Sequence, residues 1–377
     1  MKKILLVSAL LLVCLSIFMS VPLYSCSVPV FRYALERWQP SPYEIVIFYE
    51  KSLSANDKLL IKMLNEHEAG EKANITVRPV DITLEMDDDT SSIWKSVKQE
   101  KLPVMAVFYP FLSFGGELSR SEIPAAWYSG LTEKNIKLVL DSPVRRELAR
   151  QMLKGVSVVW LLIESGDKNK DAAAEKALLT ESARLEKSIK LPEPVETDYL
   201  YLDKLKLKLS LSVMKVSRTD PNEILLIKSL LNSSKEMKNI KEPVAFPVFG
   251  KGRVFYPLAG MNIKPEKIQK TVEFLAGPCA CTIKEQNPGM DLLMSIKWGS
   301  LITSTLSIDK ELPPLKGLAG FVDIKQNQTM EVKHDVEKNR KVTHSVKTNY
   351  LLRNVIMLLL VLIFTALAWY VYYNKNK

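Results

Sequence analysis

Residues 102–109 read Leu-Pro-Val-Met-Ala-Val-Phe-Tyr, an apolar run that begins at a proline. A compact apolar run of this length is typical of a buried β-strand. A proline fits best at the first position of a strand, because further inside it would remove a ladder hydrogen bond. Residues 243–250 repeat the pattern as Pro-Val-Ala-Phe-Pro-Val-Phe-Gly. The short echo suggests that one structural unit occurs twice in the chain.

Strand and helix patterns alternate around both runs. Around the first run, we predict strands at 44–50 and 74–83 and helices at 54–68, 90–100 and 143–154. Around the second run, we predict strands at 156–164, 206–216 and 253–256 and helices at 171–190, 221–232 and 264–275, with Lys251-Gly252 as a hairpin turn and Asp220 as a helix cap. This alternation predicts an α/β fold.

The order of elements resembles the thioredoxin fold, in which a cis-proline precedes the third core strand. The resemblance implies two tandem thioredoxin-like domains of βαβαββα type, at 41–155 and 156–300, with Pro103 and Pro243 as the cis-proline candidates. A single α/β domain with one continuous sheet is the alternative. Thioredoxin-like oxidoreductases carry C-x-x-C where the first helix begins, because the helix N-terminus lowers the thiol pKa. Residues 50–54 and 164–167 contain no cysteine, so the resemblance implies the fold without the activity.

Two cysteines follow the last predicted helix, in Gly-Pro-Cys-Ala-Cys at 277–281. Cys279 and Cys281 could form a strained, oxidising disulfide, supply half of a tetrahedral metal site, or be small buried side chains. The pattern leaves these three interpretations open. Glu285 and Asp291 flank the turn Asn-Pro-Gly at 287–289, which we expect to lead into a helix, and they are either an acid pair or turn caps.

The N-terminus has the pattern of an export signal, residues 1–25, in which Lys2 and Lys3 precede an apolar run. Residues 23–26, Leu-Tyr-Ser-Cys, resemble a lipobox, although Tyr24 departs from the small residue usual at that position. The resemblance makes Cys26 a lipidation candidate. Ordinary cleavage nearby and an uncleaved signal anchor are the alternatives.

The C-terminus predicts a membrane anchor. Residues 351–373 contain an uncharged apolar run of spanning length, closed by tryptophan and tyrosine residues as in an aromatic belt. The polar stretch 301–350 predicts a stalk, and 374–377 a short basic cytoplasmic tail. Export of the N-terminus followed by one later span places the soluble region outside the cytoplasm.

The formal net charge is +10, but basic and acidic residues alternate along the chain, so we expect no nucleic acid partner. Residues 28–38 predict a short helix that packs on the first domain or contacts a partner. This segment and the stretch 277–298 resemble a family of uncharacterised bacterial envelope proteins. The chain shows no nucleophile-elbow, Walker, dinucleotide-binding or zincin motif, and we expect no cofactor.

These observations predict a non-catalytic scaffold that is anchored in the cell membrane outside the cytoplasm. Its expected partners are the lipid bilayer and a membrane protein such as a transporter or an electron-transfer protein. The alternative is a thiol–disulfide or metal-handling protein that acts through Cys279 and Cys281.

Overall fold

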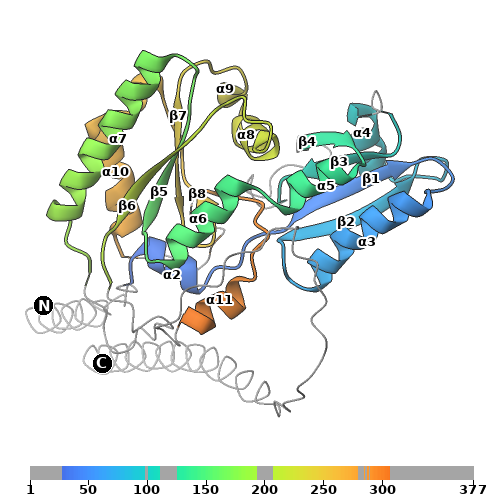
Figure 1. Cartoon of the computed structure of the whole chain (residues 1–377), viewed down its shortest axis with the longest axis horizontal. Helices are drawn as coiled ribbons and strands as arrows, with labels where there is room; N and C mark the ends of the chain where they lie inside the picture. Colours follow the sequence, from blue (N-terminus) through green and yellow to red (C-terminus); the bar gives the residue numbers. More distant parts are fainter. Residues whose placement is uncertain are drawn as a thin grey trace, which may run out of the picture. The chain divides into compact units, whose positions relative to one another are not determined.

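The computed structural model describes residues 28–97, 101–110, 125–192, 207–278, 284, 287 and 289–305. Within these residues the chain is a mixed α/β structure with two sheets that belong to one compact unit, so the α/β prediction is confirmed (Figure 1). The predicted export signal, Cys26, the membrane span and the cytoplasmic tail lie outside the described residues. In the described ranges, no helix combines the length and the apolar character needed to cross a bilayer.

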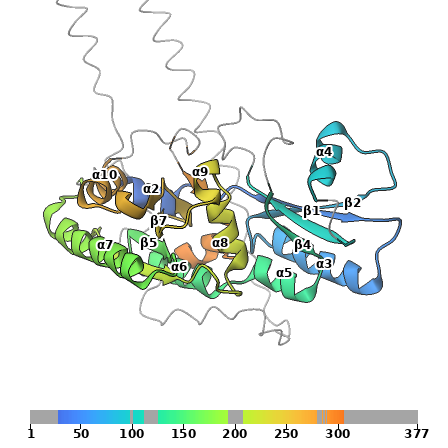
Figure 2. The same ribbon diagram turned by 90° about the horizontal axis from the view of Figure 1, so that it is seen from above.

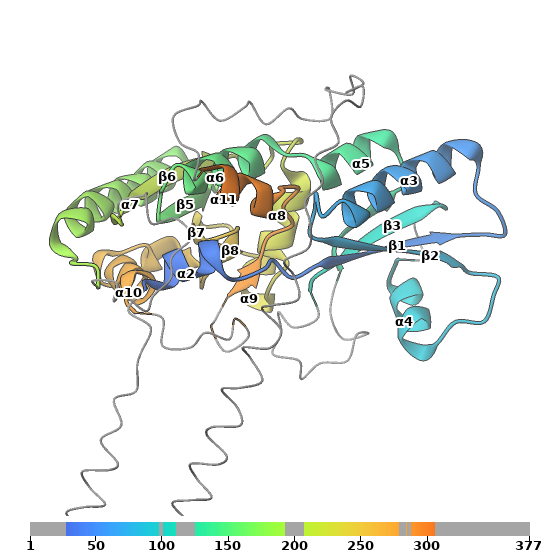
Figure 3. The ribbon, with the colours of Figure 1, turned by 90° about the horizontal axis from the view of Figure 1, so that it is seen from below.

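The first sheet has the strand order β2-β1-β3-β4 among the described residues. Its strands are β1 (Tyr43–Tyr49), β2 (Ile75–Asp81), β3 (Val104–Phe108) and β4 (Ala125–Gly130). β2 runs parallel to β1, whereas β3 runs antiparallel to both β1 and β4. Helices α3 (Ala55–Ala69) and α5 (Glu133–Leu140) cover one face, and α4 (Asp88–Val97) covers the other (Figure 3).

The second sheet repeats this order and these directions in its four main strands. β6 (Leu211–Val216) is parallel to β5 (Val158–Ile163), β7 (Val244–Phe249) is antiparallel to β5, and β8 (Arg253–Val254) is antiparallel to β7. Two short strands extend it: β9 (Leu258–Ala259) pairs with β7, and β10 (Met290–Asp291) pairs with β8. The two sheets therefore share one topology.

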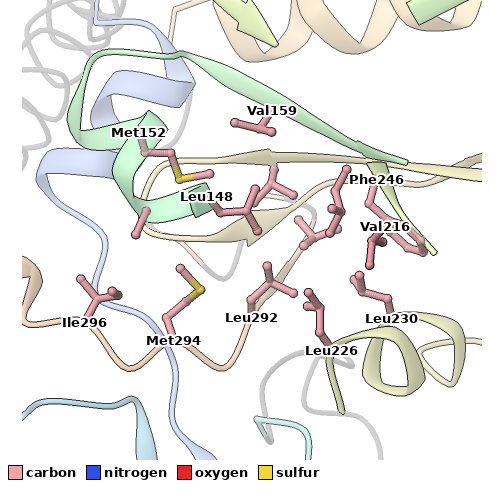
Figure 4. Close-up of a cluster of buried hydrophobic side chains, with 14 of the residues drawn as sticks. Leu148, Met152, Val159, Val216, Leu226, Leu230, Phe246, Leu292, Met294 and Ile296 are labelled. Carbon is pink, nitrogen blue, oxygen red and sulfur yellow. The ribbon is translucent and has the colours of Figure 1, made fainter. Parts of the chain in front are cut away.

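Strand β5 is buried on both sides, as its unbroken Val-Val-Trp-Leu-Leu-Ile sequence predicts. Val158, Trp160 and Leu162 face the core made with α2 (Val30–Glu36), α7 (Lys168–Ser188) and α10 (Pro265–Ala276). The alternate side chains face α6 (Pro143–Leu153), α8 (Ile224–Leu231) and α11 (Trp298–Thr305), as Figure 4 shows for Val159. Two short helices, α9 (Lys235–Lys238) and η3 (Gly260–Asn262), complete the second half.

Helix α2 packs on the second sheet and not on the first, so that expectation was wrong. Val30 and Phe31 are buried in the core with α7 and α10, and α2 lies beside α10 (Figure 2). The Val30 amide donates to the Gly277 carbonyl at 3.0 Å, and Pro29 bridges to Pro278. Helical spacing shows that a helix buries one face, but it does not identify the surface that covers that face.

Helix α6 also packs on the second sheet, where Leu148 and Met152 are buried against β5 and β7. The packing therefore changes at about residue 142, before α6, and not at the predicted boundary of 155. Because α2 precedes the first sheet and α6 follows it, the first sheet and its helices form an insertion between two helices of the second.

Three further local predictions were wrong. The predicted 221–232 helix begins only at Ile224, after a turn. The predicted helix after the Asn-Pro-Gly turn is absent over the described residues 289–297, and β10 lies there instead. Residues 301–305 of the predicted stalk belong to α11, whose Ile302 is buried against the α6 face.

The buried position of α2 leads to a stability prediction. Replacing Phe31 by Ala should lower the unfolding free energy by about 3–5 kcal/mol, because the side chain is 5% exposed and a cavity would remain. Leu179→Ala on α7, where the leucine is 51% exposed, should change it far less. Denaturant unfolding of the detergent-solubilised chain checks this. Equal, small effects of both substitutions would contradict the packing.

Candidate functional site

The start of α3 is the first place where a redox cysteine pair would lie. Ser54 caps the helix by accepting from the Asp57 amide at 3.1 Å, and the Asp57 carboxylate accepts from the Ser54 amide at 3.1 Å. This reciprocal capping box satisfies the backbone donors that a thiolate would otherwise contact. Just before it, Lys51 adopts a positive φ of 57° and its amide donates to Asp81 at 3.1 Å. The junction is built for capping and contains no thiol.

The start of α7 is the second such place, and carboxylates occupy it. Asp167 accepts from the Asn169 and Lys170 amides at 2.9 and 3.2 Å. Asp171, which is buried, accepts from the Ser165 amide at 2.7 Å and from the Gly166 amide at 3.0 Å. Negative charge at a helix N-terminus is favourable for stability, but it would repel a thiolate or a phosphate. This end is therefore closed to redox and anion chemistry.

The two cis-proline candidates differ. The Leu102–Pro103 bond is cis, and the Pro103 carbonyl accepts from the Leu131 amide at 2.9 Å. Pro243 follows a trans bond, because Leu102–Pro103 is the one cis bond among the described residues. Trans is the preferred form of most bonds to proline. Pro243 as a cis-proline is therefore corrected.

The two cysteines of the C-x-C segment, Cys279 and Cys281, lie outside the described residues, as does Glu285. Among the residues that the structure describes, no three His, Cys, Asp or Glu side chains are grouped as a metal site would require. The thiol and metal interpretations of Cys279 and Cys281 therefore remain sequence predictions.

Asp291 is the centre of a buried charged cluster next to that segment. Its carboxylate accepts from the Ser41 amide at 2.8 Å, from Lys284 Nζ at 2.8 Å and from an Arg253 guanidinium nitrogen at 3.2 Å. Its backbone carbonyl accepts from the Tyr43 hydroxyl at 2.9 Å. The Asp291 side chain is 5% exposed. Asp291 is thus a structural tie between the two sheets rather than half of an exposed acid pair.

A third cation, Lys251, lies close enough to the Asp291 cluster for its charge to interact with that of Lys284, and it is buried. The residue is 6% exposed. Burial, reinforced by the nearby Lys284 charge and opposed by Glu36, lowers the pKa of Lys251 to about 8. The α2 helix covers this turn so closely that a Cβ on Gly250, at φ 59°, would lie 2.6 Å from the Ala34 Cβ. The hairpin pattern alone predicts an exposed lysine, and the burial comes from a distant helix.

Arg145 makes a second tie between the sheets. Its guanidinium donates to four backbone carbonyls, two of them at the C-terminal end of α5, at distances of 2.6–3.0 Å: Leu138, Val139, Asp141 and Leu293. Burial lowers the pKa of Arg145 to about 10. The buried Glu223 carboxylate bonds the Ser142 hydroxyl and the Val144 amide at the start of α6, and burial raises its pKa. Both groups join segments of the chain, and the buried Arg145 Nε lacks a hydrogen-bonding partner among the described residues.

A cleft of about 680 Å³ opens between the end of α3 and residues 294–300. Its polar groups are largely occupied by the protein itself. Glu68 accepts from the Val77 amide at 3.0 Å, and the Asn74 amide donates to the Ser41 and Leu292 carbonyls at 2.9 and 3.0 Å. Among the buried polar side-chain atoms of the described lining, Trp298 Nε1 lacks a hydrogen-bonding partner. The Glu68 and Asn74 side chains of this cleft are thus used for structural hydrogen bonds.

Comparison with protein-family models and with curated proteins finds no match to this chain. The site is therefore interpreted from its own geometry.

The buried position of Asp291 gives the second prediction. Asp291→Asn should lower the unfolding free energy by about 3–5 kcal/mol, because it leaves Arg253 and Lys284 as buried, unneutralised cations. The control is Glu133→Gln, which removes an exposed carboxylate paired with Lys137 and should have little effect. Denaturant unfolding at neutral pH measures both. Similar changes in unfolding free energy for the two variants would show that the cluster does not stabilise the fold.

Lys251 gives a pH-dependent prediction. Between pH 8 and 10.5 the folded chain has lost the Lys251 proton while the unfolded chain keeps it, so this group makes stability rise with pH. Lys251→Met keeps the aliphatic stem and should stabilise the protein at pH 7 by about 3 kcal/mol, because a shift of one pKa unit corresponds to about 1.4 kcal/mol. That advantage should disappear near pH 10.5. A difference between the two proteins that is constant across this range, measured by thermal unfolding, would contradict the lowered pKa.

Proposed function

We propose that this chain is a membrane-anchored, non-catalytic scaffold made of two thioredoxin-like halves that lie outside the cytoplasm. The observation that carries the proposal is the chemistry at the starts of α3 and α7. Serine and aspartate side chains cap both helices where redox cysteines would be needed. A helix N-terminus that its own side chains satisfy can support folding and binding, but it cannot activate a thiol.

The thioredoxin-like part of the proposal is supported by topology. Each sheet has two parallel strands joined through a helix, then an antiparallel strand led by a proline, then a further antiparallel strand. A helix follows the last of these four strands in each half. This repeat is the pattern expected from the sequence echo between residues 102–109 and 243–250.

The scaffold part is supported by the way in which the halves are joined. Asp291, Arg145 and Asn74 each bond backbone or side-chain groups from both sides of the junction. Polar ties of this kind hold two surfaces in one register, because any shift would leave buried groups without partners. A fixed pair of sheets suits the presentation of a binding surface. The membrane anchor predicted at 351–373 would place that surface beside a membrane protein, such as a transporter or an electron-transfer protein.

The proposal predicts a stoichiometric partner. The tagged full chain, cross-linked in its native membrane and purified in mild detergent, should recover one membrane protein in fixed proportion. The same tag on a chain that lacks residues 28–305 should recover none, since the anchor alone presents no scaffold. Quantitative mass spectrometry of both samples measures this. Recovery of the full chain without any partner in fixed proportion would contradict the scaffold.

The same preparation tests the alternative function. Intact mass before and after reduction and alkylation reports the state of Cys279 and Cys281, and elemental analysis reports bound metal. Fully reduced, slowly alkylated and metal-free cysteines would exclude a thiol–disulfide or metal-handling role. A reducible bond between the pair, or a stoichiometric metal, would favour that role over the scaffold.

A further inference from the structure

Two exposed aromatic side chains, Tyr256 and Phe274, form a patch around the half-buried Phe255 in the second half. The Phe255 ring stacks on Phe274 with centroids 4.8 Å apart and meets Tyr256 edge-on at 5.0 Å. Tyr256 is 64% exposed and Phe274 is 40% exposed. Aromatic rings that stack on one another at the surface present a contiguous apolar area, which usually marks a contact with another molecule.

Basic residues share the patch's face of α10. Lys267, Lys270 and Phe274 are spaced i, i+3 and i+7, which puts their side chains on one side of the helix. All three are exposed. The face therefore combines lysines with aromatic rings, the composition of helices that bind at a membrane interface.

The polar residues of α10 are kept on a different flank. Gln269 accepts from the Arg184 guanidinium of α7 at 2.7 Å, and its amide donates to Glu273 at 2.7 Å. These contacts engage the Glu273 carboxylate on the α7 side, although Glu273 and the exposed Glu266 are spaced i+3 and i−4 from Lys270. Within the part of the chain that the structure describes, neither Lys267 nor Lys270 forms an ion pair with these carboxylates.

The patch is close to the point where the chain leads toward the N-terminal anchor. The Val30 amide donates to Gly277 O at 3.0 Å, and Phe274 lies three residues before Gly277 on α10, roughly 4.5 Å along the helix axis. Cys26 lies three residues before Pro29, so the chain can separate them by no more than about 11 Å. An anchor at or before Cys26 therefore keeps the bilayer surface within short reach of the aromatic rings.

We infer that Phe255, Tyr256, Phe274, Lys267 and Lys270 form a lipid-contacting surface that sets the orientation of the second half on the bilayer. The inference rests on the membrane anchoring of the proposed function and, for the short tether, on an N-terminal anchor at or before Cys26. Aromatic rings favour the headgroup region, and lysines favour anionic lipids. A short tether raises the effective concentration of the bilayer at this face, so even a weak contact is populated.

Photo-cross-linking tests this surface in the full chain. Benzoyl-phenylalanine replaces Tyr256 or Phe274, and the protein is reconstituted in vesicles of phosphatidylethanolamine with phosphatidylglycerol or of phosphatidylcholine alone. We expect phospholipid adducts at both positions, with a several-fold lower yield in phosphatidylcholine and after joint Lys267→Glu and Lys270→Glu substitution. The matched control is the same group at Leu59 on α3, which is 56% exposed and should give no lipid adduct.

Other outcomes would overturn the inference and leave the anchor intact. These are equal lipid adducts at Tyr256 and Leu59, or no adduct at Tyr256 and Phe274 although the chain floats with the vesicles. A third outcome that would overturn it comes from cross-linking in native membranes: adducts of both positions with a protein instead of with lipid. Failure of the chain to float with vesicles would instead contradict the membrane anchoring of the proposed function.

Discussion

The buried carboxylate of Asp291 joins three segments that are far apart in the sequence. It accepts from Ser41 just before β1, from Arg253 on β8 and from Lys284 after α10. Removing a carboxylate from water costs several kcal/mol unless cations and amides replace the lost hydration. The fold can therefore bury Asp291 only if all three segments meet. Their meeting holds Ser41, where the chain enters the first sheet, against β8 and Lys284 of the second half.

Arg145 imposes the matching constraint where the chain returns. Its guanidinium donates to carbonyls at the end of α5 and also to the Leu293 carbonyl. One cation therefore joins the end of the inserted half to the segment that follows β10. Both crossings of the chain are thus fixed by buried charge, in addition to apolar packing. Domains joined by small polar interfaces usually move relative to each other. Two charged ties that use the same short segment, 291–293, oppose such motion.

The sequence predicts best where one segment determines its own structure. The continuous apolar run of β5 has to be a buried strand, and the capping box at Ser54 fixes the start of α3 within one residue. The helix expected at 290–294 fails because the Asn-Pro-Gly turn marks a change of direction and does not specify the element that follows. Leu292 and Met294 face the core of the second sheet, while Leu293 between them faces that of the first. This alternation is extended structure, and three residues are too few to distinguish it from a helix.

The candidate site was less predictable, because its main features depend on distant partners. Lys251 stands in a correctly predicted hairpin turn, yet α2, more than two hundred residues earlier, buries it. Asp291 was recognised as an acid near a turn, but its cations come from β8 and from Lys284. No local pattern carries that information. The absence of redox cysteines at the starts of α3 and α7 was predictable, because residues 50–54 and 164–167 contain no cysteine. The structure adds which side chains cap those helix ends.

The insertion also bears on which half is available to a partner. Helix α2, before the first sheet, and helix α11, at the end of the described chain, both pack in the cores of the second sheet. In the proposed topology both covalent routes to the membrane therefore start from the second half, since the first half contributes neither route. A lipid contact through α10 would occupy the second half further. The helices of the first sheet, α3, α4 and α5, are then the surfaces that neither anchor restrains.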